Sequence, residues 1–205
     1  MSAQRAAGIK RCPWAGADPE YQRYHDQEWG FPLTRDEALF EKLVLEGFQA
    51  GLSWITILRK RPNFRRAFDG FDAAAISAYK AKDVARLMKD EGIVRNRAKI
   101  EATIDNAKAY VRLSQRTSLR EFLFGFLDAG PVQNRHQTMA DIPAQTELSK
   151  RISKALKAEG FRFVGPTTVY AFMQSAGMVN DHLVDCHRYA PCAKLQRAAE
   201  KIAAP

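Results

Sequence analysis

The stretch from Cys12 to Gly30, which reads CPWAGADPEYQRYHDQEWG, is the part of the chain around which we expect the fold to be organised. It concentrates a thiol, an imidazole, carboxylates and large aromatic side chains, and it shows no sustained helical or strand period. Its aromatic residues are therefore not typical of the apolar stripe of an amphipathic element. We interpret four of them as the lining of a pocket: Trp14, Tyr21, Tyr24 and Trp29.

The same stretch supplies half of a predicted metal site. Cys12 and His25 are matched near the other end of the sequence by His182 and Cys186, which makes a set of two cysteines and two histidines. Zinc takes four such ligands tetrahedrally, and the H-x3-C spacing lets the second pair bind from one helical turn or a tight loop. Either pair alone is more typical of unconnected cysteines and histidines, but both together favour a structural Zn²⁺ that joins the N- and C-terminal segments. Two further residues are close enough to act as substitute ligands: His187 and Cys192.

Length and composition indicate a globular intracellular protein. A chain of 205 residues is long enough for one domain or two small lobes with a real core, and 46% hydrophobic residues with 12 glycines and 9 prolines exclude disordered and fibrous classes. Three cysteines cannot all pair, which argues against a secreted disulfide scaffold. The first residues lack the apolar segment of a signal peptide, and no later run is long enough to span a membrane. We expect a cytoplasmic protein with no membrane partner.

The charge balance indicates a polyanionic partner. Lysine and arginine number 32 against 23 acidic residues, which gives a net charge of +9 and a pI near 9.6. Nucleic acid is the first partner to consider for such a chain, although a solvated lysine surface produces the same balance.

The apolar pattern predicts an all-α fold made of many short helices. Thr34 and Glu37 form a capping-box pattern ahead of apolar residues at helical spacing from 39 to 48. A second helix is expected from Ser53 to about residue 61, and Pro62 is expected to begin a third.

The remainder of the chain also reads as helices joined by short turns. We find no internal repeat, no low-complexity tract and no alternating strand pattern. Further helices are expected at 72–79, 83–89, 96–116, 122–127, 146–160 and 169–176, with caps at Asp72, Ser118 with Glu121, Thr146 and Gly177.

Two of these helices are joined by a tight turn around Gly92, which is the pattern of a helix-hairpin-helix motif. Such a motif presents the backbone N–H groups of a helix start to a phosphate. Arg95, Arg97 and Lys99 place positive charge at the same point. The hairpin is therefore a candidate surface for DNA.

Four ordered motifs carry a resemblance to a known family. They are Cys12-x-Trp14, then Tyr24-His25-Asp26-x-Glu28-Trp29-Gly30, then the run from Leu45-Glu46-Gly47 through Gln49-Ala50-Gly51-Leu52-Ser53-Trp54, and finally Phe163-Val164-Gly165 with Asn180-Asp181-His182. From about residue 11 to about residue 189, the chain resembles the DNA-3-methyladenine glycosylase I family of base-excision repair enzymes.

The resemblance implies an all-α helix-hairpin-helix glycosylase that acts on alkylated double-stranded DNA as a monomer. It implies a structural zinc on Cys12, His25, His182 and Cys186, and a glycosylase domain over 11–192 between an N-terminal extension (1–10) and a C-terminal tail (193–205). The expected site has Glu46 and Tyr24 as candidate catalytic residues, Trp14, Tyr21, Trp54 and Glu46 around the base, and Gly51, Leu52, Gly92, Arg95 and Arg97 on the DNA.

The chemistry of this site follows from the charge of the damaged base. An enzyme that acts on a base must flip it out of the duplex, and aromatic faces attract a cationic base such as 3-methyladenine by roughly 0.5–2 kcal/mol. Glu46 adds charge complementarity that neutral adenine cannot use. Taken singly, Glu46 also fits an exposed helix residue paired with Lys42, and Trp54 fits an ordinary core residue. Gly51 and Leu52 are placed to enter the gap left by the flipped base, although a plain turn has the same sequence.

A cationic base leaves as a neutral molecule, so its excision requires no acid to protonate it. Stabilisation of the sugar cation and admission of water suffice. The hairpin position at which lyase-type relatives carry a nucleophilic lysine is Asn96 here. The sequence therefore predicts a monofunctional glycosylase that leaves an abasic site.

Two other functions are considered. A zinc hydrolase needs an open coordination position, whereas two cysteines and two histidines close the shell. A non-catalytic zinc-containing helix-hairpin-helix module would use the hairpin and the basic surface alone. It gives no role to the aromatic cluster or to Glu46.

Overall fold

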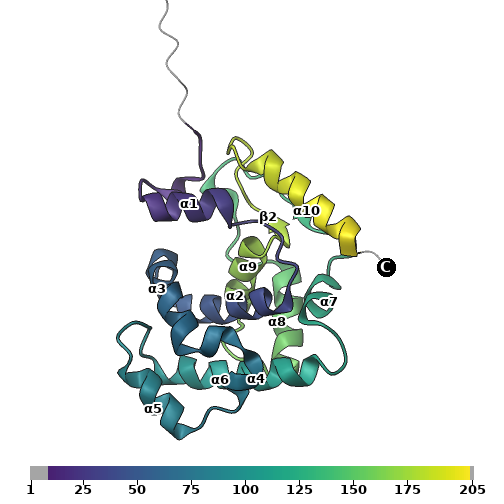
Figure 1. The fold of residues 1–205 in the computed structure, drawn as a ribbon. Coiled ribbons are helices and arrows are strands. Elements are labelled where there is room, and N and C mark those ends of the chain that lie inside the picture. The colour runs from purple at the N-terminus through teal and green to yellow at the C-terminus, as the bar shows by residue number, and fades with distance from the viewer. Residues whose placement is uncertain (1–8, 204–205) are drawn as a thin grey trace, which may run out of the picture.

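The computed structural model describes residues 9–203, and the described chain is almost entirely helical (Figure 1). This confirms the predicted all-α class. The α-helices are α1 (Pro19–Gln27), α2 (Asp36–Gln49), α3 (Trp54–Ala67), α4 (Ala73–Ser77), α5 (Ala81–Lys89), α6 (Arg97–Leu113), α7 (Leu119–Phe124), α8 (Glu147–Ala158), α9 (Pro166–Ser175) and α10 (Tyr189–Ala203). Short 3-10 turns lie at Pro13–Ala15, Asp69–Phe71 and Met139–Asp141.

Helix α2 is the centre of the molecule. Every residue from Leu39 to Phe48 except Glu41 is buried, as expected for a helix enclosed by other elements rather than resting on a surface. Figure 1 shows α1 and α10 at one end of the molecule, with α4, α5 and α6 at the other and α2 between them. A residue on α2 is therefore placed with little freedom, because helices on all sides fix its position.

Two expectations for the first helices are wrong. Helix α2 begins at Asp36 and its first turn has no side-chain cap, so Thr34 and Glu37 form no capping box. The Asp36 carboxylate instead accepts hydrogen bonds from the N–H groups of Leu119 and Arg120 and caps α7. Pro62 lies inside α3 and starts no new helix. A proline removes only one backbone donor, and tertiary packing of Phe64 holds the helix together beyond it.

Several predicted caps are confirmed. Asp72 accepts hydrogen bonds from Ala74 and Ala75, Ser118 and Glu121 form a capping box, and Thr146 caps α8. The predicted hairpin is also present, since α5 and α6 are joined by a turn that contains Gly92, and Asn96 caps α6 through the Lys99 N–H.

The two ends of the described chain contain elements that the sequence pattern missed. Helix α1 lies inside the opening stretch, and α10 begins at Tyr189 and runs across the expected boundary at 192/193. The buried Gln196 of α10 donates to the carbonyls of Gly30 and Val179. Residues 1–8 of the expected N-terminal extension lie outside the described residues.

A minimal parallel sheet also contradicts the prediction of no strands. Strands β1 (Val132–Gln133) and β2 (Val179–Asn180) pair Val132 with Val179 and Gln133 with Asn180. Two residues are too short for an alternating pattern to be recognised.

Gly177, between α9 and β2, has a positive φ of 75°. A Cβ at this position would stand 2.6 Å from the Pro32 nitrogen, so glycine permits the segment before α2 to cross here. Among the helices of residues 9–203, none is both long and apolar enough to cross a membrane.

Candidate functional site

A cavity of about 350 Å³ opens between α1, α2, α3 and α9. The predicted base-pocket residues all line it, and Trp29 joins them: Trp14, Tyr21, Tyr24, Trp29, Glu46 and Trp54. The structure thus brings together side chains from three separate parts of the sequence around one space. It also confirms that the four aromatic residues of the opening stretch form a lining.

The local structure of α1 explains how its tyrosines face the cavity. Asp18 caps the helix by accepting hydrogen bonds from Glu20 and Tyr21, and Pro19 occupies the first turn. Tyr21 and Tyr24 are three residues apart, so they project from the same face of the helix. The Trp14 ring lies 5.0 Å from the Tyr21 ring and the Tyr24 ring 5.4 Å from that of Trp54, between centroids. These contacts form a continuous aromatic wall.

The Tyr24 hydroxyl is suited to donate or accept a hydrogen bond rather than to act as a base. Tyr24 is 2% exposed, and burial followed by the negative charge of Glu46 raises its pKa well above the ordinary tyrosine value. A hydroxyl that stays protonated can hydrogen-bond or stack, but it cannot remove a proton from water.

Glu46 is the carboxylate of the cavity, and it is buried rather than exposed. Its Oε1 accepts a hydrogen bond of 2.9 Å from the Ser175 hydroxyl of α9, and only 4% of the residue is accessible. Burial raises the pKa of Glu46 to about 7, although the Lys42 cation and the Ser175 hydrogen bond oppose that shift. The interpretation of Glu46 as an exposed surface residue is therefore wrong. A ligand with a positive charge would favour its ionised form.

The opposite wall was not predicted from the sequence. It contains one face of α9 and the segment after the Met139–Asp141 turn, and the residues are Thr167, Tyr170, Ala171, Gln174, Met139, Ile142, Pro143 and Ala144. The four α9 residues recur at i, i+3, i+4 and i+7, which is a signal that the sequence does contain. Tyr170 and Gln174 both donate to the buried Asp181 carboxylate, at 2.6 and 2.7 Å, and this fixes that wall.

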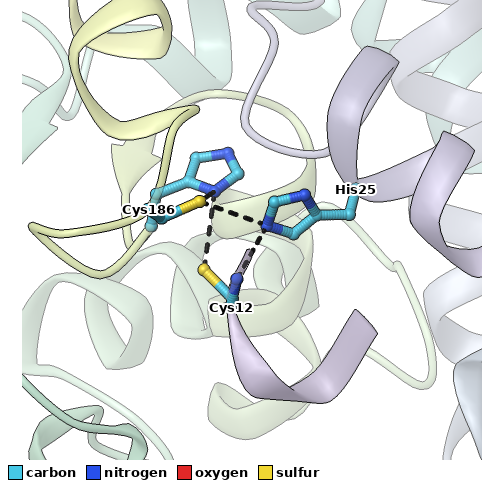
Figure 2. A group of neighbouring side chains, drawn as sticks. Cys12, His25 and Cys186 are labelled. Carbon is cyan, nitrogen blue, oxygen red and sulfur yellow. Dashed lines mark hydrogen bonds between the residues drawn. The ribbon is translucent and has the colours of Figure 1, made fainter. Parts of the chain in front are cut away.

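The predicted metal ligands lie together, and Figure 2 shows Cys12, His25 and Cys186 close to one another. The donor atoms of Cys12, His25, His182 and Cys186 are all within 4.8 Å of one another, and all four residues are buried. Sulfur-to-nitrogen distances are 3.6 Å for Cys12 to His182, 3.5 Å for Cys186 to His25 and 3.6 Å for Cys186 to His182. Tetrahedral zinc with ordinary bond lengths separates its sulfur and nitrogen ligands by about 3.5 Å.

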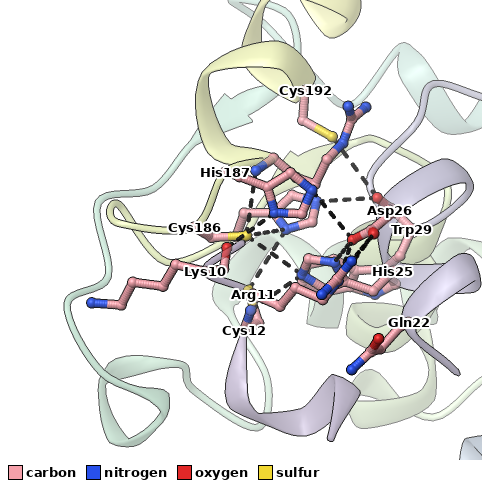
Figure 3. A network of polar contacts seen from close by, with 12 residues as sticks. Lys10, Arg11, Cys12, Gln22, His25, Asp26, Trp29, Cys186, His187 and Cys192 are labelled. Carbon is pink, nitrogen blue, oxygen red and sulfur yellow. Dashed lines mark hydrogen bonds and ion pairs between the residues drawn. The ribbon is translucent and has the colours of Figure 1, made fainter. Parts of the chain in front are cut away.

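The surroundings of the four residues also suit a cation (Figure 3). The second nitrogen of His25 is 2.8 Å from the Asp26 carboxylate, and Arg11 holds that carboxylate with hydrogen bonds of 2.7 and 3.0 Å. The second nitrogen of His182 is 3.2 Å from the Trp29 carbonyl. Metal-bound histidines are usually oriented in this way by a carboxylate or a backbone carbonyl.

The two sulfurs are close enough to affect each other's protonation. A hydrogen bond between them, with burial, raises the pKa of the Cys12 thiol, and the same hydrogen bond lowers the pKa of Cys186. The alternative ligands are placed elsewhere: the His187 ring is near the Lys10 carbonyl and Asp26, and Cys192 is nearest to the Trp29 carbonyl.

The group of two cysteines and two histidines shares a wall with the pocket. The Trp14 ring lies 5.1 Å from the His25 ring, and the Trp29 ring lies 4.7 Å from the His182 ring in an edge-to-face contact. Fixing these two histidines therefore also fixes two aromatic residues of the cavity.

Gly51 and Leu52, which we expect to enter the gap left by a flipped base, lie on an exposed turn between α2 and α3. Gly51 has a φ of 82° and open space where a side chain would be, and Leu52 is a large apolar residue with 39% exposure. The turn directly follows the helix that carries Glu46. Gln49 and Trp54, on either side of this turn in the sequence, both line the cavity.

The hairpin presents its arginines but not its lysine. The Arg95 and Arg97 side chains are 50% and 61% exposed and form only loose ion pairs of 3.5 Å with Glu91 and Glu101. The Gly92 N–H donates to Asp90 and its carbonyl accepts from Asn63 on α3, so Gly92 shapes the turn.

The prediction that Lys99 places its positive charge on the exposed face of the hairpin is wrong. Its ammonium is turned inward and donates to the carbonyls of Phe48 and Ala50, at 2.8 and 2.6 Å. Lys99 therefore caps the C-terminus of α2 and ties the hairpin to the Gly51–Leu52 turn, because a cation is stabilised by the carbonyls at a helix end.

Fold and site together define a class: an all-helical protein with an aromatic, carboxylate-bearing pocket beside a positively charged helical hairpin. Residues 14–189 match the family described as Methyladenine glycosylase. The chain belongs to this methyladenine glycosylase family.

Individual relatives agree with this assignment. DNA-3-methyladenine glycosylase 1 of Escherichia coli (strain K12) is 47% identical over 88% of this chain and 97% of that protein. DNA-3-methyladenine glycosylase of Haemophilus influenzae (strain ATCC 51907 / DSM 11121 / KW20 / Rd) is 48% identical over 89% and 97%. A structure of 3-methyladenine DNA glycosylase I from Staphylococcus aureus, described as the structural basis of 3-methyladenine recognition, has 36% identity and a TM-score of 0.85 over 88% of this chain and 97% of that one.

Proposed function

We propose that this chain flips 3-methyladenine out of alkylated duplex DNA and hydrolyses its glycosidic bond, leaving an abasic site in an uncut strand. The observation that carries the proposal is a buried carboxylate, Glu46, in a cavity walled by aromatic rings. We expect the chain to be active as a monomer.

Recognition of the base would use both features of the cavity. Tyr24 and Trp54 offer π faces to a flat cation, and Glu46 offers a negative charge and a hydrogen-bond acceptor for the exocyclic amine. Unmodified adenine is neutral and gains only the stacking. The Glu46 carboxylate therefore discriminates between the two bases once both have been flipped.

The chemistry requires little more than positioning. Methylation at N3 makes the base cationic while it is attached to the sugar, and the departing electrons neutralise it. The attraction of Glu46 for the base is therefore greatest before cleavage, which assigns Glu46 to selection more than to rate. Asn96 caps α6 where a nucleophilic lysine would be needed for strand cleavage. Attack by water is the step that this arrangement supports.

For the metal centre, a structural Zn²⁺ fits the residues present. Cys12, His25, His182 and Cys186 would hold it, and four protein ligands leave no open position for water activation. When bound, it would supply a cross-link between the two ends of the domain. Every residue proposed to contact the base lies outside the ligand set.

The function is tested by incubating the pure protein with methylated duplex DNA. We expect release of free 3-methyladenine and strands that break only after later treatment with alkali. Borohydride should trap no protein–DNA adduct, because no amine attacks the sugar. Strand cleavage or a trapped adduct would contradict the hydrolytic mechanism. If no methylated base is released although the protein binds DNA, the non-catalytic binding module is the better description.

The hairpin arginines should contribute affinity without lesion selectivity. Arg95→Ala or Arg97→Ala is expected to weaken binding of damaged and undamaged duplex equally, because phosphate contacts carry no base information. The slope of log K against log salt should shrink by about 0.9 for each phosphate that is no longer neutralised.

Arg35→Ala is a suitable control for this measurement. Arg35 is an exposed arginine at the opposite end of α2, about 20 Å from the Gly51 turn by the rise of an α-helix. Its replacement should leave the slope unchanged. Equal slopes for all three variants and the wild type would show that the hairpin does not face DNA.

A further inference from the structure

Lys42 places a positive charge directly behind the pocket. It is 8% exposed and lies one helical turn before Glu46 on α2. Its ammonium donates to the Tyr24 hydroxyl at 3.3 Å and lies 5.0 and 4.8 Å from the ring centroids of Tyr24 and Trp54. Lysine is almost never buried unless it is paired. A buried cation next to a pocket for a cationic base would repel that base, so the position of Lys42 needs an explanation.

The position of Lys42 excludes a role as nucleophile. Tyr24 and Trp54 line the cavity whereas Lys42 does not, so its amine lies behind the rings. A sugar attached to a flipped base could not reach it without displacing one of them.

We infer that Lys42 is a specificity-determining residue: it is the buried counter-charge that keeps the Glu46 carboxyl ionised in the empty pocket, ready for a cationic base. The inference rests on the proposed function of the pocket. Burial opposes the charge on both side chains, and each stabilises the charge of the other across one turn of α2. The pKa of Glu46 is about 7 and that of Lys42 about 8, so both are charged in a narrow interval near neutral pH.

Lys42 and Glu46 lie one turn apart on α2 and each affects the pKa of the other, but among the described residues no contact ion pair joins them. This separation matters because a direct ion pair would occupy the Glu46 oxygens. The Lys42 ammonium is instead held by the Tyr24 hydroxyl and two aromatic faces. The Glu46 carboxylate receives only the Ser175 hydrogen bond and remains available to a ligand.

Other charged groups near Lys42 are already paired with one another. Glu28, at the end of α1, binds Arg61 of α3 at 2.9 Å, and Glu41 of α2 binds Arg65 at 2.8 Å. Glu46 has the largest electrostatic effect on the pKa of Lys42, ahead of Arg61, Glu28 and Glu41. The titratable groups that face Glu46 are Lys42 on its own helix and Tyr21 and Tyr24 on α1. Lys42 is the cation among them.

The test uses 3,9-dimethyladeninium, a soluble base whose positive charge does not depend on pH. Its affinity for the wild type should rise with pH as Glu46 ionises, with a midpoint near 7. Lys42→Met should move this midpoint upward, on the order of one pH unit for a charge a few ångströms away. Above the new midpoint its affinity should equal or exceed that of the wild type, because repulsion between Lys42 and the probe has been removed.

Two controls separate this effect from loss of structure. Lys42→Arg keeps the charge and should keep the wild-type midpoint. The double replacement Lys42→Met with Glu46→Gln removes both titrating groups and should bind with no pH dependence in this range. A merely structural role for Lys42 predicts weaker binding at every pH with an unchanged midpoint. That outcome, or a lowered midpoint, overturns the inference.

A measurement on the wild type covers the case in which Lys42→Met does not fold. The ¹³C shift of the Glu46 carboxyl should show a second inflection near pH 8, where Lys42 loses its proton. A single inflection overturns the inference. Wild-type protein that shows both inflections but binds no probe at any pH would reject the proposed function and leave the charge coupling intact.

Discussion

Replacement of Cys186 by serine is expected to remove the bound metal and to lower the free energy of unfolding by at least about 4 kcal/mol, the range in which loss of a metal site falls. For a chain of this size, that corresponds to a decrease in Tm on the order of 10 °C. The reason is geometric. Cys186 is the sulfur that contacts both His25 and His182, so its loss separates the two halves of the ligand set.

The variant should also bind methylated base more weakly. Trp14 and Trp29 pack against His25 and His182, and both rings line the pocket. Thermal unfolding followed by circular dichroism measures the loss of stability. Elemental analysis of the purified protein measures the loss of metal.

Cys192→Ser provides a matched control. Cys192 is a buried thiol on α10, near the same segment but outside the ligand set, so its replacement should keep one zinc per chain. The metal assignment fails if metal-replete wild-type protein contains no zinc. Zinc retained by Cys186→Ser and lost by Cys192→Ser would identify Cys192 as the true ligand.

Glu46→Gln is expected to reduce the affinity for methylated base by ten- to a hundredfold. A charge-assisted hydrogen bond contributes roughly 1.5–3 kcal/mol, and glutamine offers a neutral acceptor in its place. The fold should persist, because the amide oxygen can still accept from Ser175. Single-turnover excision at saturating protein should fall less than affinity, since the charge that Glu46 attracts disappears as the bond breaks.

Glu41→Gln is the corresponding control. It makes the same chemical change on the same helix, but Glu41 is paired with Arg65 and does not line the cavity. Its base affinity should equal that of the wild type, and both variants should bind undamaged duplex normally. Equal affinities for Glu46→Gln and wild type would exclude Glu46 as the discriminating group.

The sequence predicted those features whose signals are local. Ser118 with Glu121, Thr146 and Asp72 each satisfy N–H groups of the next helical turn, so spacing alone reveals them. Where a capping side chain has a distant partner, the local signal misleads. Asp36 does not help to begin the helix in which it lies, because it caps α7 more than eighty residues later.

The candidate site also contains some residues that the sequence reveals and others that only the folded structure brings together. The sequence reveals three residues of the site through motifs shared with the glycosylase family: Tyr24, Glu46 and Trp54. The α9 wall shows a plain helical period that looks like core, and only the fold places Gln174 in the same cavity as Glu46. The inward turn of Lys99 and the buried cation of Lys42 depend on long-range packing, which charge in the sequence does not reveal.

The distance along the chain between the two pairs of proposed metal ligands has a consequence for the protein during its synthesis on the ribosome. Cys12 and His182 are separated by 170 positions, which takes on the order of 10–30 s to translate. Until then Trp14 and Trp29 lack the contacts that the C-terminal segment provides, although α2 and the helices around it can already pack. We expect nascent chains arrested before Cys186 to be compact yet unable to bind a methylated base. Unfinished copies would then not compete with finished enzyme for lesions.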